Sequence, residues 1–545
     1  MSGDDESASK GDAPTTPDTE LLRGEEAAAG APPREAFASA REEFAARASH
    51  CRADYSTACS SFSKSLSASL FMFFATLFST IALGAHLQLA TKNRIGLSEY
   101  LVMNSVSGVL HSLLGTQPLL IIRPTGPITA ILTKLDTLAD TLSVDIDQLL
   151  AATGVCVSVL MFTIAFTGVS THIQRLTPFT HEIFACFVCS IYLYDGISDV
   201  VHRFMVNNLE NFAVSLFDLN LALLVFGLSV QLQGARRWAF FPSKLRAVIA
   251  DYAVTIAVVS ATLCSYGLDV VSAEVLRIRL PASFAPSNEE RPWYSASLAT
   301  ASMTTWLAAA MAAVPISFFF YMDQGISALL CQLPELGLRR GTYFHSTFVA
   351  LGILNLCGPM MGCPFVTGSL PHSPQFVRAL STHQSDGSPV VAESRLAPAL
   401  VYLLIGLPLL APGLIKAVPE AAIDGVLIFV GYEGIVCTGL WRRLLLCVTP
   451  KYDVHFPPSM RAIRATRVRQ YTLLQVLLLA VCWAVNLSPF GLAVAFVIVA
   501  LVPFREKLLP MLFSSRELLV LDGPKHASDD APMATIRDDS SHFRD

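Results

Sequence analysis

Two apolar segments of this chain are interrupted by glycine and proline, one in each half. The first reads GTQPLLIIRPTGPITAI over residues 115–131, and the second reads GPMMGCPFVTGSLPHSP over residues 358–374. Proline lacks a backbone N–H donor and fixes its own φ, so a helix does not run unbroken through either segment. Irregular backbone at membrane depth is tolerated only where protein or a water-filled cavity covers it. Two such breaks in matching halves predict a transporter with its binding site at the breaks.

The composition places the chain in a lipid bilayer. Hydrophobic residues make up 53% of its 545 residues and charged residues only 15%, too few to cover the surface of a soluble protein of this length. Several stretches approach the roughly 20 apolar residues needed to cross a bilayer, and the one from Thr304 to Met322 carries no charge. We therefore expect an all-α polytopic membrane protein.

The two ends of the chain and one long loop differ from this pattern. Residues 1–60 are acidic, rich in Ser, Pro and Ala and free of apolar periodicity, so we expect a disordered cytosolic tail. Residues 521–545 are polar and are expected to form a second cytosolic tail. Basic residues gather in other loops, whereas the long stretch from Asp269 to Ser295 contains Glu289 and Glu290 beside a few arginines. By the positive-inside rule, residues 271–300 are expected to be extracellular.

The two breaks lie at equal distances from the starts of two long apolar regions, which begin near Leu66 and Trp306. Equal offsets are expected when the second half of a transporter repeats the first with inverted topology. We therefore predict a first repeat over residues 61–270 and a second over residues 301–520. Chance is the alternative, because glycine and proline are frequent in membrane helices.

After each break the chain is predicted to resume as a short helix. The free N–H groups and the positive dipole end of such a half-helix favour an anion, and two facing ends would bind one without a resident cation. Nearby hydroxyls add donors, although each is equally well explained as a helix cap. The predicted substrate-binding residues are Thr125, Gly126, Pro127, Ile128 and Thr129 at the first break, and Val366, Thr367, Gly368 and Ser369 at the second.

Six stretches of the chain, in order, resemble one known family. They read GVLHSLLGTQPLLIIRPTGPI, THEIFACFVCSIYLYDGIS, LRAVIADYAV, FYMDQGISALL, GCPFVTGSLPHSPQF and LIFVGYEGIVCTGLWRRLLL. Together they resemble the bicarbonate transporter family, which comprises anion exchangers, sodium-bicarbonate cotransporters and boron transporters. The resemblance extends over about residues 60 to 520.

This resemblance implies a fold and an assembly. The expected fold has 14 transmembrane segments in two inverted repeats of seven, divided into a core domain and a gate domain, with half-helices in segments 3 and 10. Members of the family are generally homodimers through the gate domain, so we expect a homodimer here.

Asp323 follows an apolar stretch long enough to bury it, and Ser327 lies four residues later on the same helical face. An ionisable side chain at membrane depth costs about 2.5 to 3.5 kcal/mol and is functional by default. In the family an acidic residue of the eighth helix lies beside the substrate. The resemblance thus implies that Asp323 binds a coupling cation or carries a proton, with Ser327 beside it. The alternative is a structural pair between Asp323 and a basic residue.

Arg123 stands directly before the first break, where many members of the family have a small or apolar residue. Anion exchangers instead carry an arginine on the tenth segment, where this chain has Val366 to Leu370. A guanidinium is permanently charged and forks onto an oxyanion such as bicarbonate or borate. We hypothesise that Arg123 replaces the family arginine from the opposite half-helix. The competing hypothesis is that Arg123 faces the gate interface or pairs with Asp323 without contacting substrate.

These observations predict a secondary active transporter of a small inorganic oxyanion that works by alternating access. The eighth helix resembles sodium-coupled bicarbonate carriers, whereas the tenth, LPHSPQFVRAL, resembles boron transporters, so bicarbonate and borate both stay open. Coupling to sodium, to protons or to chloride exchange stays open as well, as does the role of His372.

The alternative is a non-transporting membrane scaffold or receptor. An enzyme is not expected, because the chain has no HExxH, GxSxG or paired CxxC motif. We expect no cofactor, no resident metal and no nucleic-acid partner. The expected location is the plasma membrane, with both termini in the cytosol.

Overall fold

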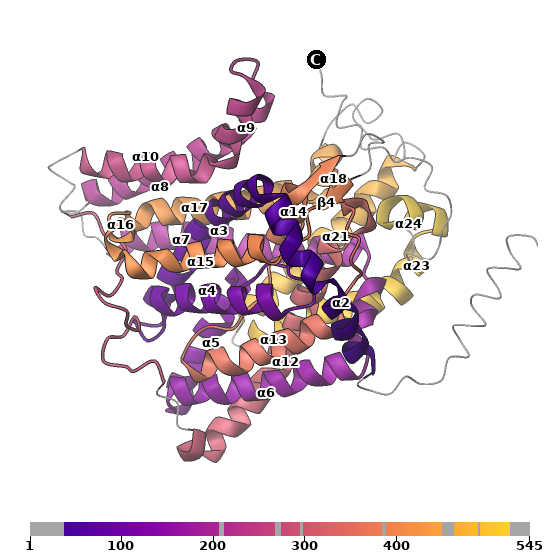
Figure 1. Ribbon diagram of the computed structural model, residues 1–545, viewed down its shortest axis with the longest axis horizontal. Helices are drawn as coiled ribbons and strands as arrows, with labels where there is room; N and C mark the ends of the chain where they lie inside the picture. Colours follow the sequence, from indigo (N-terminus) through magenta and orange to yellow (C-terminus); the bar gives the residue numbers. More distant parts are fainter. Residues whose placement is uncertain are drawn as a thin grey trace, which may run out of the picture.

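The computed structural model describes the chain over residues 38–206, 212–267, 274–294, 298–383, 389–448, 463–488 and 491–523. Within these ranges the protein is mostly helical (Figure 1). Most of the two predicted tails, residues 1–37 and 524–545, lies outside the described residues.

Six helices of the described chain are long and apolar enough to cross a membrane. They are α3 (Phe62–Ala90), α6 (Ile146–Phe166), α7 (Pro178–Val206), α8 (Phe212–Gln233), α12 (Met303–Cys331) and α21 (Ala465–Leu487). Two bent pairs raise the number to eight if each pair is one span. They are α9 (Ser243–Asp251) with α10 (Ala253–Tyr266), bent by 66°, and α17 (Glu420–Val436) with α18 (Gly439–Val448), bent by 73°. The expected 14 segments in two inverted repeats stay a prediction.

The helices pack into two groups. In the first helix group, α6 packs against α12 and α13 (His345–Met360), and α4 (Leu97–Leu114) packs against α3 and α15 (Leu396–Leu410). In the second helix group, α17 packs against α7 and α8, and α8 packs against α10. Figure 1 shows α8 and α10 side by side at one edge of the molecule and α6 and α12 at the opposite edge. Contacts of α3 with α17 join the groups, and α22 (Val494–Pro503) packs against both α12 and α7.

Shorter elements connect these helices. In chain order they are η1 (Val169–Arg175), η3 (Gly234–Arg237), η4 (Leu298–Thr300), η5 (Pro334–Leu336), β3 (Ser381–His383), β4 (Pro389–Val391), α16 (Pro412–Lys416), η6 (Gly491–Ala493), η7 (Phe504–Leu508), α23 (Leu509–Leu512) and α24 (Ser515–Asp522).

Both interrupted segments leave the helical conformation, as predicted. Strand β1 (Ile122–Arg123) precedes α5 (Gly126–Leu142), and β2 (Thr367–Gly368) precedes α14 (His372–Leu380). The two strands pair antiparallel, with Ile122 opposite Gly368 and Arg123 opposite Thr367. The breaks from the two halves of the chain therefore meet in space.

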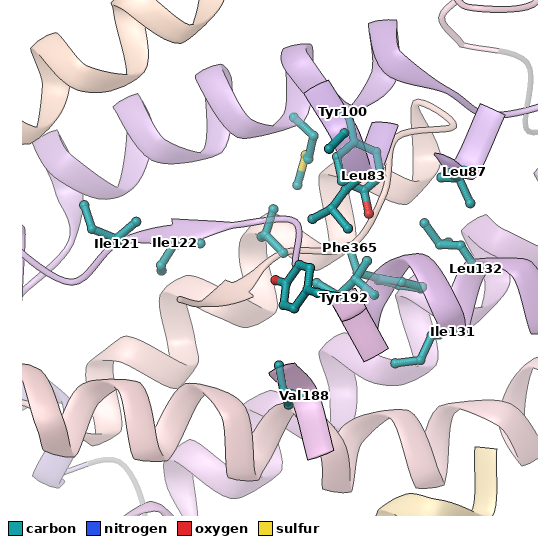
Figure 2. Packing of buried hydrophobic residues seen from close by; sticks show 14 of the residues in the cluster. Leu83, Leu87, Tyr100, Ile121, Ile122, Ile131, Leu132, Val188, Tyr192 and Phe365 are labelled. Atoms are coloured by element: carbon teal, nitrogen blue, oxygen red, sulfur yellow. The ribbon is translucent and has the colours of Figure 1, made fainter. Parts of the chain in front are cut away.

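The crossing of the two strands lies inside the largest apolar core of the protein. Figure 2 shows Tyr192 and Phe365 close to the crossing, with Ile131 and Leu132 of α5 beside them. Ile122, Leu132 and Phe365 are each 0% exposed. Burial on all sides explains how irregular backbone is tolerated at this depth.

Residues 38–60 correct the prediction of a disordered tail. They form helix α2 (Ala38–Ser60), which crosses the front of the molecule in Figure 1. Asp54 of α2 is 0% exposed and binds Arg47 at 2.7 Å, Arg340 at 2.5 Å and Arg395 at 3.0 Å. The sequence argument failed here because it looked for an apolar stripe, whereas buried ion pairs hold this helix.

A second carboxylate of α2 binds the start of α13. Glu43 accepts hydrogen bonds from the backbone N–H groups of Phe344, His345 and Ser346, at 3.0, 3.1 and 2.7 Å. These N–H groups have no partner within a helix, and a carboxylate satisfies them and complements the helix dipole. Helix α2 is therefore attached to the first helix group at two places.

Replacing Asp54 by Ala should destabilise the protein strongly. The change leaves three arginines without their shared carboxylate, and breaking a buried ion pair in this way costs about 3 to 5 kcal/mol. We expect a clearly lower Tm in detergent. In the control, Asp251→Ala breaks an ion pair with Arg236, which is 65% exposed, and should leave Tm nearly unchanged. Equal Tm values for the two variants would show that the network does not hold α2.

Candidate anion-binding site

Side chains satisfy the backbone that the two breaks leave open. Asn355 of α13 donates to the Val366 carbonyl oxygen at 2.9 Å and accepts from the Val366 N–H at 2.8 Å. The Ile122 N–H donates to the Tyr402 hydroxyl at 2.9 Å. A buried backbone group without a partner is costly, so these contacts fix the crossing in one conformation.

Arg123 lies at this crossing with its side chain buried at 1% exposure. Its Nη2 donates to Ser79 Oγ of α3 at 3.0 Å, and its Nε donates to the Pro124 carbonyl oxygen at 3.3 Å. Its Nη1 is buried without a hydrogen-bond partner among the described residues. No carboxylate in the described part of the chain pairs with Arg123, so the predicted alternative of a pair with Asp323 is wrong.

The other buried arginines in the described ranges all have anionic partners. The ion pairs are Arg47 with Asp54, Arg203 with Asp424, Arg291 with Glu99, Arg395 with Asp54, Arg443 with Glu182 and Arg505 with Asp522. A buried ion without a partner costs several kcal/mol. Arg123 is therefore the one buried arginine of the described ranges without an anionic partner, and a bound anion would supply that partner.

The start of α5 differs from the expectation of free N–H groups. The Gly126 N–H donates to the hydroxyl of Tyr192 on α7 at 2.9 Å, and Pro127 has no N–H. The N–H groups of Ile128 and Thr129 donate to the Thr125 carbonyl oxygen at 3.0 and 3.2 Å. The helix dipole remains, but protein oxygens already occupy these backbone donors.

Polar groups at the second break also have hydrogen-bond partners within the protein. Ser369 donates its N–H to the Ile121 carbonyl oxygen at 2.7 Å, and its hydroxyl lies 2.7 Å from His372 Nδ1. His372 is the first residue of α14, so this contact joins Ser369 to the start of that helix. The Thr129 hydroxyl is likewise hydrogen-bonded, to Tyr100. Ser369 and Thr129 are therefore not available to a ligand in this conformation.

Asp323 lies on α12 at 2% exposure, next to β2. Its Oδ2 has no hydrogen-bond partner within the described chain. Ser327, one turn later, donates to the Gly368 carbonyl oxygen at 2.9 Å and so attaches α12 to the crossing. Asp323 therefore has a free buried oxygen, whereas the Ser327 hydroxyl is engaged with the backbone.

The free polar atoms at the crossing form a mixed set. Among the described residues they are Arg123 Nη1, Thr125 Oγ1, Asp323 Oδ2 and both side-chain amide atoms of Gln324, and the Thr367 hydroxyl lies beside the Asp323 carboxylate. The set combines one fixed cation, several neutral donors and one acid. It suits an oxyanion at Arg123 and a proton or small cation at Asp323.

Sequence reasoning missed three contributors to this site. Ser79 and Tyr192 reach it from α3 and α7, and only tertiary packing brings them there. Figure 2 shows Tyr192 pointing toward the crossing. Gln324 had a sequence signal, since it follows Asp323 in the same apolar stretch.

Replacing Gly368 by Ala should disrupt the crossing. A Cβ there would lie 2.7 Å from Ser327 Cβ and 3.0 Å from Gln324 Oε1. Overpacking of this kind typically costs about 1 to 3 kcal/mol, which a lower Tm in detergent will measure. The control is Gly227→Ala in α8, where a Cβ meets no atom within 4 Å. A Tm for Gly368→Ala as high as that of the control would show that the strands separate easily.

Comparison with known proteins gives one family. The family profile described as "HCO3- transporter integral membrane domain" matches residues 35–214 and 206–526. The chain is 27% identical over 485 residues to the Band 3 anion transport protein of Homo sapiens, covering 84% of this chain and 53% of that protein. It is 27% identical over 508 residues to anion exchange protein 3 of Oryctolagus cuniculus, covering 84% of this chain and 41% of that protein. The chain thus spans about half the length of these relatives, or less.

Solved structures show the same fold at low sequence identity. The transmembrane domain of a cyanobacterium bicarbonate transporter, BicA, aligns with a TM-score of 0.53 at 15% identity, covering 76% of this chain and 96% of that one. Murine Solute Carrier 26 family member A9, an anion transporter in the inward-facing state, aligns with a TM-score of 0.51 at 14% identity, covering 82% and 68%.

Proposed function

The chain belongs to the family of HCO3- transporter integral membrane domains, and we propose that it is a secondary active transporter of a small inorganic oxyanion, bicarbonate or borate. Members of this family are multi-pass membrane proteins that transport anions, and they are not enzymes. Transport proceeds by alternating access, in which the first helix group acts as the core domain and the second as the gate domain.

The observation that carries the proposal is the unpaired charge of Arg123. Its guanidinium is buried, its Nη1 is free, and the described chain offers it no carboxylate. An oxyanion that accepts from Nη1 and from the free hydroxyl of Thr125 would supply the missing partner. This arrangement supports the hypothesis that Arg123 replaces, from the first half-helix, the arginine that anion exchangers carry on the tenth segment.

Asp323 is the proposed coupling residue. An ionised Asp323 beside the substrate would repel an anion, so a sodium ion or a proton bound there would favour anion binding. Ser327 adjoins it on the same face of α12, although its hydroxyl is directed to Gly368. Chloride exchange is the remaining mode, in which two anions use the Arg123 site alternately.

The assembly, the membrane location and the topology are proposed from family membership. We propose a homodimer in the plasma membrane with both termini in the cytosol, residues 271–300 outside, and repeats over residues 61–270 and 301–520. A non-transporting scaffold or receptor is the second candidate function, and it would require neither Arg123 nor Asp323. The cost of burying Arg123 without a partner favours transport.

Replacing Arg123 by Gln should abolish anion flux. Purified protein in proteoliposomes is tested with bicarbonate, borate, sulfate and chloride, with and without sodium. We expect a loss of at least about tenfold, which corresponds to 1.4 kcal/mol. Arg236→Gln neutralises an exposed arginine and should leave flux unchanged. Wild-type flux for a folded Arg123→Gln variant would exclude the role of Arg123, and absence of flux in the wild type for all four anions would favour the scaffold.

Replacing Asp323 by Asn should change coupling rather than anion recognition. The amide keeps the shape of the side chain but binds neither a proton nor sodium as a charged partner. We expect flux that no longer depends on sodium or on a proton gradient, measured in the same vesicles. An Asp323→Asn variant with the full wild-type dependence would place the coupling site elsewhere.

A further inference from the structure

A cluster of one histidine and two aspartates lies outside the site described above. His86 of α3 places its Nδ1 2.7 Å from Asp199 Oδ2 and its Nε2 3.9 Å from Asp195 Oδ1. Both aspartates belong to α7. The three side chains are 18%, 19% and 13% exposed for His86, Asp199 and Asp195, so the cluster is mostly buried but reachable by water.

The cluster joins the two helix groups. His86 lies one turn before the end of α3, which packs in the first group, whereas α7 packs against α17 in the second. The end of α3 is next to the loop over residues 274–294, because the Ser287 hydroxyl accepts from the Ser98 N–H at 3.2 Å at the start of α4. The cluster therefore lies on the side of the predicted outer loop.

The same face of α7 leads from the cluster to the anion site. Tyr192, Asp195 and Asp199 follow one another at intervals of three and four residues, so they lie on one helical face. Tyr192 contacts Gly126 at the crossing, and Asp199 lies roughly 10 Å further along the helix at 1.5 Å per residue. Asp195 lies between them, within electrostatic range of Tyr100, which binds Thr129 of α5.

In the described structure, His86 is the only basic side chain in direct contact with Asp195 and Asp199. Beyond Asp199, Glu420 of α17 lies within electrostatic range. The remaining charges of that region form their own network, in which Arg203 of α7 pairs with Asp218 of α8 and with Glu420 and Asp424 of α17. Arg279 acts on Glu420.

We propose that His86, Asp195 and Asp199 form a proton-binding latch that holds the two helix groups together on this side of the membrane. The proposal rests on the proposed function and adds a second ligand, the proton, at a place distant from Arg123. When the groups are together, a protonated His86 is held between two carboxylates. When this side opens, His86 separates from both and releases its proton to the water on that side.

The direction of the pH effect follows from this geometry. Protonated His86 gains its carboxylate partners only in the closed arrangement, so a proton stabilises closure. Raising the pH on this side removes the proton and favours opening, and histidine is the side chain that titrates nearest to neutral pH. Because apparent affinity scales with the fraction of carriers open to the anion, higher pH on this side should lower KM measured from this side.

The test measures KM for the transported anion separately from each side of proteoliposomes that contain the full chain. His86→Gln and Asp199→Asn should each lower KM from the latch side by about fivefold and raise it from the other side, as expected for a coupling of ordinary size. The double variant should resemble either single variant, since each single change already removes the same interaction.

Between pH 6.5 and 9, KM from the latch side should fall for wild type and stay constant for His86→Gln. His86→Lys, which keeps the positive charge over this range, should retain a high KM without pH dependence.

The matched control is Asp140→Asn. Asp140 binds Arg94 at 2.7 Å at the same end of the molecule, but this pair joins α5 to the α3–α4 turn and does not bridge the groups. It should leave KM unchanged from both sides. Equal changes from the two sides, additive effects in the double variant, or an unchanged pH profile in His86→Gln would each overturn the latch. All these outcomes require anion flux in the wild type, so failure of the latch is distinguishable from failure of the proposed function.

Discussion

The structure depends on one constraint, which is that backbone opened inside a membrane must find hydrogen-bond partners within the protein. Proline and glycine open it in both halves, and the partners come from helices distant in sequence. Asn355 satisfies Val366, Tyr402 satisfies Ile122 and Tyr192 satisfies Gly126. The irregular segments are therefore as specifically placed as a helix would be.

The buried charges of the described chain differ in whether the protein supplies their ionic partners. Buried arginines elsewhere in the described chain are neutralised by acids within the protein, so their role is structural. Arg123 and Asp323 sit beside the crossing and have no such partners. In the transporter proposed above, the ionic partner of such a charge is the substrate, which binds and dissociates. Burying the charge without a partner in the empty protein costs free energy, and reversible binding requires that cost.

Much of this arrangement could be predicted from the sequence, because its signals are strong and local. Glycine and proline marked both breaks, and isolated charges in apolar stretches marked Arg123 and Asp323. The contacts of Tyr192 and Ser79 could not be predicted, since they depend on how helices from different parts of the chain pack. The same holds for the occupied N–H groups of α5 and for α2, which ion pairs rather than an apolar face hold in place.

The pairing of β1 with β2 has a mechanical consequence. A hinge that opened between the two half-helices would have to break their shared strand pairing together with the bond from Ser327 to Gly368. Moving one half-helix relative to the other therefore costs more free energy than moving both together. In the alternating-access cycle proposed above, both half-helices and a bound anion would therefore move together as one rigid unit.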